Sequence, residues 1–264
     1  MNTGRDDYYK LPTYPLKGVN ITLKDYQEGP LENWTTGALH FNGDNQYAVL
    51  ANEDICRSVT LDARGRNGSL KRTVSGADLS SPQIHTSNFL IEICFRTDAG
   101  QTDAVLMQKI DGAGYVLGLN KAGGVTLAAT ASGKTAWLES RSAVNDGRWH
   151  HVIAEADRKA RTFTVYIDGK QDAEGPGLEA DLSLANDADL FVGGTPQGHD
   201  LHGAIDFMRI ARGTLADSKT TIDELYAWEF NGPFLQDFTG RRRPADGGYA
   251  GAIDEEAPSN AGGQ

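Results

Sequence analysis

The chain has 264 residues, of which 39% are hydrophobic and 23% are charged, as in ordinary globular proteins. Its formal net charge of -11 argues against a nucleic-acid partner, because neutralising phosphates requires clustered Lys and Arg. No stretch approaches the roughly 18–20 consecutive apolar residues of a membrane span, and the polar first residues lack the apolar segment of a signal peptide. We therefore expect no membrane partner, and a cytosolic chain, a processed chain or a piece of a longer one.

Residues 1–33 are expected to form an extended lead-in, because Pro12, Pro15 and Pro30 oppose helix there. Within it, the alternating run 18–23 predicts a strand. Two β-prone runs follow, residues 38–41 and 46–50, on either side of Asn42-Gly43. An Asn-Gly pair between two such runs predicts a β-hairpin.

Residues 51–87 are polar and show no regular pattern, so we expect a long functional loop. Arg64, Arg66 and Arg72 within it are candidate ligands for an anionic sugar, because the guanidinium fork matches a carboxylate or sulfate group. The alternative for this segment is a solvated loop with no ligand. The two cysteines, Cys56 and Cys94, could form one disulfide, although the sequence alone does not show that they meet. The position of Cys94 in a strand-like run favours a buried free thiol.

From residue 89 onward, short apolar runs alternate with turn signals. Phe89, Ile91, Ile93 and Phe95 recur at every second position, which is typical of a strand with one apolar face. Eight further strands are predicted, at residues 104–107, 115–119, 124–129, 136–139, 150–154, 162–167, 190–193 and 203–210. Their regular spacing predicts an all-β chain folded as a two-sheet antiparallel β-sandwich, or jelly roll.

The end of the chain differs from this pattern. Residues 221–226 predict one short helix, since their apolar positions have helical spacing behind a threonine cap. Residues 231–264 are rich in Gly, Arg, Asp and Pro and are expected to be a partly disordered tail. The sandwich domain is therefore expected over residues 34–230.

Three segments, in order, resemble the laminin-G-like jelly roll of the concanavalin A-like lectins and glucanases. The first is Phe41-Asn42-Gly43-Asp44-Asn45-Gln46-Tyr47-Ala48. The second is Asp146-Gly147-Arg148-Trp149-His150-His151-Val152 with the later Tyr166-Ile167-Asp168-Gly169, and the third is Gly203-Ala204-Ile205-Asp206-Phe207-Met208-Arg209-Ile210. Separately, residues 237–255 resemble the closing segment of secreted right-handed β-helix proteins, many of which act on polysaccharides. This second resemblance implies that the domain belongs beside a polysaccharide-degrading enzyme.

Catalytic patterns of this fold are largely missing from the sequence. Retaining glycosidases place closely spaced carboxylates on one strand, so that nucleophile and acid meet at one sugar. Glu155-Ala156-Asp157 begins such a run but continues with basic residues. Gln83-Ile84-His85 matches one element of alginate-lyase jelly rolls, yet the accompanying tyrosine motif is missing. We expect neither hydrolase nor lyase activity, with a lyase using an unrecognised site as the remote alternative.

The resemblance implies one metal site. In many relatives the Asp-bearing late strand returns beside the opening strand and helps to hold a structural calcium ion, which prefers carboxylate and carbonyl oxygens. Carried over to this chain, the ligands would be Asp44, Asp206 and a backbone carbonyl near Gly43. The run His199–His202 is a weaker metal candidate. His150 and His151 are not one, because adjacent strand residues point to opposite faces.

Sugar binding requires exposed flat aromatic rings beside polar groups. Trp137, Tyr166 and Tyr115 are the candidates, each in a predicted strand, and the alternative for each is an aromatic ring that merely packs against its neighbours. We therefore predict a non-catalytic module that binds a polysaccharide or oligosaccharide, attached to a polysaccharide-degrading enzyme and secreted or held at the cell surface. The rival is a structural or protein-adhesion laminin-G-like domain. The sequence names neither the glycan nor the oligomeric state.

Overall fold

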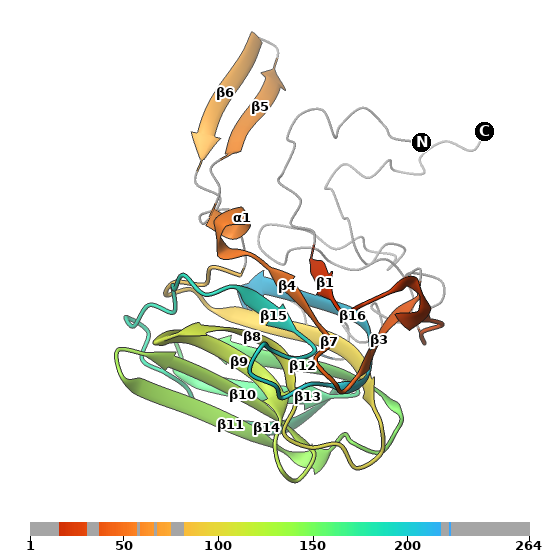
Figure 1. Ribbon diagram of the computed structural model, residues 1–264. Helices are drawn as coiled ribbons and strands as arrows, with labels where there is room; N and C mark the ends of the chain where they lie inside the picture. Colours follow the sequence, from red (N-terminus) through yellow and green to blue (C-terminus); the bar gives the residue numbers. More distant parts are fainter. Residues whose placement is uncertain are drawn as a thin grey trace, which may run out of the picture.

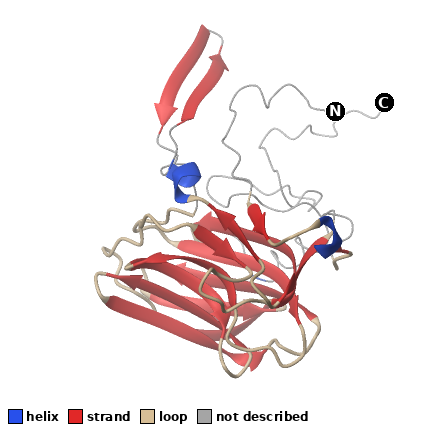
Figure 2. Ribbon diagram, in the orientation of Figure 1, coloured by secondary structure: helices blue, strands red, loops and turns tan. Residues whose placement is uncertain are grey.

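Two antiparallel sheets of seven strands each, called sheet A and sheet B, form the body of the molecule (Figure 1). The computed structural model describes residues 16–30, 37–56, 59–65, 68–74, 82–217 and Ile222. Strands dominate these residues, and the helical segments η1 and α1 are short (Figure 2). The predicted two-sheet antiparallel β-sandwich is confirmed.

The strand order is β1-β4-β15-β8-β9-β10-β11 in sheet A and β14-β13-β12-β7-β16-β3-β2 in sheet B. A separate two-stranded sheet contains β5 and β6. The elements are β1 Lys17–Val19, η1 Leu23–Asp25, β2 Tyr26–Gln27, β3 Ala38–Asn42, β4 Tyr47–Leu50, α1 Asn52–Cys56, β5 Val59–Gly65, β6 Gly68–Val74, β7 Phe89–Thr97, β8 Val105–Asp111, β9 Ala113–Leu119, β10 Gly124–Ala131, β11 Lys134–Ala143, β12 Trp149–Asp157, β13 Thr162–Ile167, β14 Lys170–Pro176, β15 Leu190–Val192 and β16 His202–Arg212.

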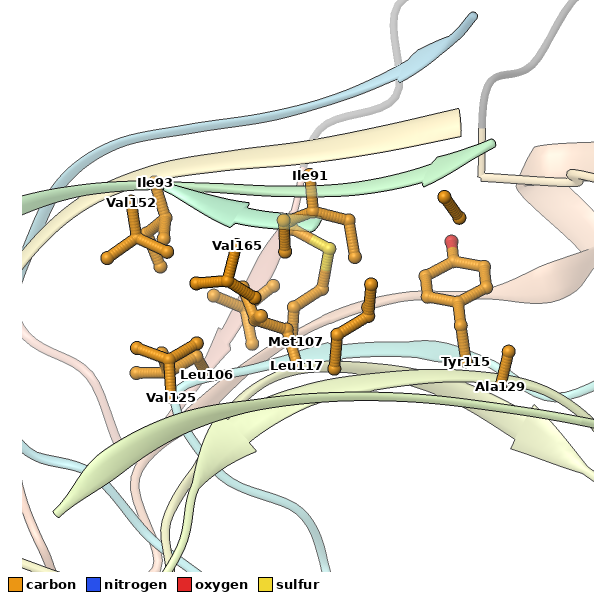
Figure 3. Packing of buried hydrophobic residues seen from close by; sticks show 14 of the residues in the cluster. Ile91, Ile93, Leu106, Met107, Tyr115, Leu117, Val125, Ala129, Val152 and Val165 are labelled. Atoms are coloured by element: carbon orange, nitrogen blue, oxygen red, sulfur yellow. The ribbon is translucent and has the colours of Figure 1, made fainter. Parts of the chain in front are cut away.

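The core lies between the sheets and consists of side chains at alternate strand positions. Ile91 and Ile93 of β7 point from sheet B toward Leu117 and Val125 of sheet A (Figure 3). All four side chains are fully buried. Because successive strand residues point to opposite faces, the same alternation leaves the residues between them on the outer face of each sheet. The side chains on these two outer faces therefore do not take part in the core.

The segment around Asn42-Gly43 is not the predicted hairpin. Strand β3 before it pairs with β2 and β16 in sheet B, whereas β4 after it pairs with β1 and β15 in sheet A. The turn therefore crosses from one sheet to the other. Gly43 and Asn45 both have positive φ, a backbone conformation that Gly and Asn adopt most readily, which explains the turn signal in the sequence.

Residues 51–87 are also more regular than predicted. They contain α1 and the hairpin β5–β6, which is hydrogen-bonded to neither large sheet and stands away from them (Figure 1). The nine strands predicted after residue 88 are all present, and β14 was not anticipated. In the lead-in, β1 and β2 add one short strand to each sheet. Apart from Ile222, the predicted helix and the tail lie outside the described residues.

Cys56 and Cys94 are both free and do not form a disulfide with each other. Cys94 is buried, as expected. Burial is also the main reason that the pKa of the Cys94 thiol is raised well above its ordinary value. Within the part of the chain that the structure describes, no helix has the length and apolar character needed to cross a membrane.

Candidate ligand-binding face

Trp137 is the most exposed large aromatic side chain in the described strands. It lies on β11, at the edge of sheet A, with 61% of its surface exposed. The next residue, Leu138, faces the core and pairs with Leu127 of β10. Alternation along β11 therefore forces the indole onto the outer face of sheet A. A single exposed ring is common on protein surfaces, so its meaning depends on whether its neighbours form a contiguous surface with it.

The register of the strands places Trp137 at the end of a row that crosses sheet A. Each member is the antiparallel partner of the next one, on neighbouring strands β11, β10, β9, β8, β15 and β4. We call this set the outer row of sheet A: Trp137, Ala128, Val116, Gln108, Phe191 and Val49.

The outer row is uncharged and accessible. None of its six members is buried, although they come from the interior strands as well as from the edge. Near its far end the Phe191 ring meets the Tyr47 ring edge-on, with centroids 5.7 Å apart. Among the described residues, neither the Gln108 amide nor the Trp137 indole N–H makes a hydrogen bond. The row thus offers two aromatic rings, one side-chain amide and one indole N–H on one surface.

The sequence candidate Tyr115 is not part of this face, and the prediction that it binds a ligand is wrong. Its ring is fully buried between the sheets (Figure 3), packs 5.5 Å from the Phe89 ring, and donates its hydroxyl to the carbonyl oxygen of Pro82 at 3.0 Å. Burial raises the pKa of this hydroxyl far above its ordinary value. Tyr115 shares the inward side of β9 with Leu117, and this alternation was the signal that sequence analysis overlooked.

Tyr166 lies on the outer face of sheet B, away from Val165 and Ile167 as expected. It is only partly exposed, because it packs against a small apolar cluster that includes Leu90 and Ile153. Burial is also the main reason that the pKa of Tyr166 rises to about 12. Trp137 and Tyr166 therefore belong to opposite outer faces and cannot form one site.

A charged network that the sequence did not reveal lies on this same face of sheet B. Glu92 of β7 is fully buried, and its Oε1 lies 2.5 Å from Nε2 of His151 on β12. Its other carboxylate oxygen pairs with Arg209 of β16. Burial alone would raise the pKa of Glu92, but the Arg209 guanidinium and the His151 ring outweigh it and keep the carboxylate ionised. The only signal in the sequence was a glutamate inside an otherwise apolar run.

His150 and His151 point to opposite sides of β12, as expected for neighbours on a strand. The ring of His150 is held at the end of β12 by two carboxylates, Asp168 at 2.9 Å and Asp146 at 3.1 Å. The hydrogen bond to Asp168 is the largest cause that raises the pKa of His150. His150 thus joins the turn before β12 to the turn after β13, which explains the Asp-Gly-Arg-Trp-His-His motif structurally.

The three arginines of residues 51–87 lie in or beside the β5–β6 hairpin. Arg64 pairs with Ser69 and Arg72 pairs with Leu61, so the two arginines are three register positions apart. This corresponds to about 10 Å along the ribbon. Arg66 lies outside the described residues. The role of these arginines in binding an anionic glycan stays a prediction.

The predicted calcium ligands are not brought together. On the paired strands β3 and β16, Asn42 lies opposite His202, and Asp206 is four residues further along β16. Asp206 therefore lies about 13 Å from the Asn42 end of the strand, next to Gly29 instead. The register therefore does not place Asp44 and Asp206 next to each other. Calcium binding stays a prediction.

The carboxylate next to the Asn42–Asn45 turn is Asp200, whose Oδ2 accepts a hydrogen bond from the backbone N–H of Asn45 at 3.0 Å. The two histidines around it turn to different partners: His199 to Asp103, and His202 to Asp98 at 3.2 Å. The described residues contain no group of three or more His, Cys, Asp or Glu side chains placed to hold a metal ion.

Comparison with known proteins agrees with this architecture. The profile of the Concanavalin A-like lectin/glucanases superfamily matches residues 71–221, more than half of the chain. The chain belongs to this superfamily. The superfamily match confirms the resemblance seen in the sequence motifs, and it covers β7 to β16, which supply five strands of each sheet.

Three individual proteins are similar to this chain in sequence or in fold. A stretch of 122 residues is 30% identical to human pikachurin and covers 46% of this chain but only 12% of pikachurin. The binding domain of botulinum neurotoxin DC, solved with rat synaptotagmin II, has a TM-score of 0.51 at 9% identity, covering 83% of this chain and 47% of that one. The Ruminococcus gnavus IT-sialidase CBM40, solved with α2,3-sialyllactose, has a TM-score of 0.45 at 18% identity, covering 62% and 90%. At these two identities the likeness to the solved structures concerns the fold.

Proposed function

We propose that this chain is a non-catalytic carbohydrate-binding domain, and that its ligand lies on the outer row of sheet A. The observation that carries the proposal is the exposure of Trp137 at the end of an uncharged, accessible row. Membership of a superfamily of lectins and glucanases supports it, although a fold hosts many functions.

The physical basis is the match between an indole ring and a sugar ring. One face of a pyranose presents C–H bonds, which pack against an aromatic face, while its hydroxyl groups at the rim require hydrogen-bond partners. Trp137 supplies the ring, and the indole N–H and the Gln108 amide supply groups without hydrogen-bond partners among the described residues. The Ala128 side chain between them is small, so a ligand can approach the sheet closely.

Two further points belong to the proposal. We infer attachment to a polysaccharide-degrading enzyme, which the likeness of residues 237–255 to the end of secreted β-helix proteins supports. A secreted or cell-surface location would follow from that attachment. Both would be tested by identifying the full-length gene product and the compartment in which it accumulates.

The binding proposal is tested by measuring retention on neutral, uronic and sulfated polysaccharides, with Trp137→Ala as the critical variant. Loss of a central aromatic contact is expected to weaken binding by about tenfold or more. Tyr26→Ala is the matched control, because Tyr26 is similarly exposed at 58% but lies at the edge of sheet B.

Three results would contradict the proposal. Equal losses with both variants would mean that Trp137 is not specifically involved. Binding that weakens with salt and is lost with Arg64→Ala would place an anionic glycan at the β5–β6 hairpin instead. Absence of binding to every glycan, together with a defined protein ligand, would favour the adhesion function.

A further inference from the structure

The outer row of sheet A has a second aromatic group at the end opposite Trp137. Phe191 of β15 belongs to the row, and Tyr47 of β4 packs edge-on against it. Both rings are partly exposed on the outer face. The face therefore carries two aromatic platforms rather than one, and both are formed by strands whose positions the sandwich fixes.

The distance between the platforms follows from the sheet order. From β11 to β15 there are four strand spacings, which at about 4.8 Å each amount to about 19 Å. One strand spacing is close to the length of one pyranose unit in an extended chain, so the two platforms are about four sugar units apart. A mono- or disaccharide can touch only one of them.

The surface between the platforms is suited to a chain that lies flat across the strands. Ala128, Val116 and Gln108 form the middle of the row, and none carries a charge. Beside this middle section lie small residues: Thr126 is paired with Gly118 on one side, and Thr130 with Gly114 on the other. Short side chains leave room for sugar rings. The Thr130 hydroxyl lies 2.9 Å from the Thr135 hydroxyl and, as a group with one donor and two acceptor positions, keeps capacity for a further hydrogen bond.

Charge narrows the class of ligand. The chain as a whole has a net charge of -11, so an anionic polysaccharide would be repelled unless it found local cations. No member of the outer row is a cation. The strand pairing places one cation next to the row, Lys17, which lies opposite Val49 at the end far from Trp137. An uncharged ligand gains the ring contacts without this electrostatic cost.

We propose that the outer row of sheet A binds an extended, uncharged polysaccharide chain that runs across the strands, with one sugar unit over Trp137 and another, about four units further along, over Phe191 and Tyr47. This inference rests on the proposed function and specifies its ligand. The domain would then bind internal segments of a polysaccharide, because a short oligosaccharide leaves one platform empty.

The test is the dependence of affinity on chain length. Calorimetric titration would use β-1,4-linked oligomers of glucose, xylose and mannose, from two to six units each. We expect affinity for at least one series to rise until both platforms are covered, at about five units, and to be constant thereafter. Phe191→Ala should lower affinity for the longest oligomer by about tenfold and leave the disaccharide unchanged, whereas Trp137→Ala should lower both.

A second variant tests the same site in case Phe191→Ala does not fold. Val116→Arg places a long side chain in the middle of the row, where it should block a crossing chain without touching a disaccharide on Trp137. Gln171→Arg is its matched control, because Gln171 is exposed on β14 at the edge of sheet B and the change in charge is the same. Circular dichroism of each variant verifies that the sandwich is retained.

Failure of this inference is distinguishable from failure of the proposed function. If affinity is constant from two units upward, depends on Trp137, and ignores Phe191 and Val116, the extended site is overturned while carbohydrate binding stands. If none of these oligomers binds, while the uronic or sulfated polysaccharides of the retention test do, the uncharged ligand is overturned. If no oligomer or polysaccharide binds, and the row instead contacts a protein or a second copy of this chain, both proposals are overturned.

Discussion

Nδ1 of His150 lies 2.9 Å from Oδ2 of Asp168, across the hairpin formed by β12 and β13. The other ring nitrogen faces Asp146 at 3.1 Å. With a carboxylate at each nitrogen, the imidazolium form can donate two hydrogen bonds, and the Asp168 contact is the largest cause that raises the pKa of His150 above its ordinary 6.5. Partial burial of the ring opposes the shift without reversing it.

This geometry predicts that stability falls with rising pH near neutrality. A group whose pKa is higher in the folded protein than in the unfolded chain stabilises the folded protein. This stabilisation is fully present at pH values below the pKa of the unfolded chain, here about 6.5, and is lost as the pH rises through the higher pKa of the folded protein. We expect the free energy of unfolding, measured in urea, to decline across that window. His150→Gln should remove the decline, whereas His199→Gln, at a half-exposed histidine, should preserve it. A His150→Gln profile that still declines would contradict the assignment.

The buried network of sheet B predicts a large loss of stability when its centre is neutralised. In Glu92→Gln, Arg209 and His151 would face an uncharged amide inside the protein. Breaking a buried ion pair by removing one partner costs roughly 3–5 kcal/mol. Chemical unfolding measures this loss, and Glu174→Gln serves as the exposed control. A loss below about 1 kcal/mol would show that the pair is solvated in solution.

The burial of Tyr115 between the sheets predicts that its substitution changes the free energy of unfolding but not the affinity for a glycan. Tyr115→Phe removes only the hydroxyl that bonds to the Pro82 carbonyl, so the unfolding free energy should fall by about 1 kcal/mol. Glycan affinity should stay at the level of the unchanged protein, in contrast to Trp137→Ala. Reduced affinity for Tyr115→Phe in a fully folded sample would restore Tyr115 to the binding site.

The separation of Asp44 and Asp206 predicts independent behaviour. Residues that share no ion and lie more than about 10 Å apart usually have additive effects. We expect the changes in Tm of Asp44→Asn and Asp206→Asn to sum in the double variant, with and without calcium. Coupling that appears only when calcium is present, and disappears with chelator, would show that the two carboxylates hold one ion after all.

Local patterns in the sequence were sufficient for most individual strands. The alternation of Phe89, Ile91, Ile93 and Phe95 predicted β7, and the Asp168-Gly169 pair predicted the turn between β13 and β14, where both residues have positive φ. These features depend on residues that are close along the chain, so the sequence displays them directly. The motif around His150 was enough to indicate the superfamily, but not the two carboxylates that hold the ring.

Only the tertiary structure decided which strands meet and which faces stay open. Asn42-Gly43 specifies a turn, but whether β4 returns to the same sheet depends on β15 and β1, far away along the chain. Trp137, Tyr166 and Tyr115 all lie in alternating strands, yet one is exposed, one half-covered and one buried. Alternation separates the two faces of a strand, whereas exposure depends on what packs against each face. That packing, like the register that separates Asp44 from Asp206, is set by contacts between distant segments, which no local pattern records.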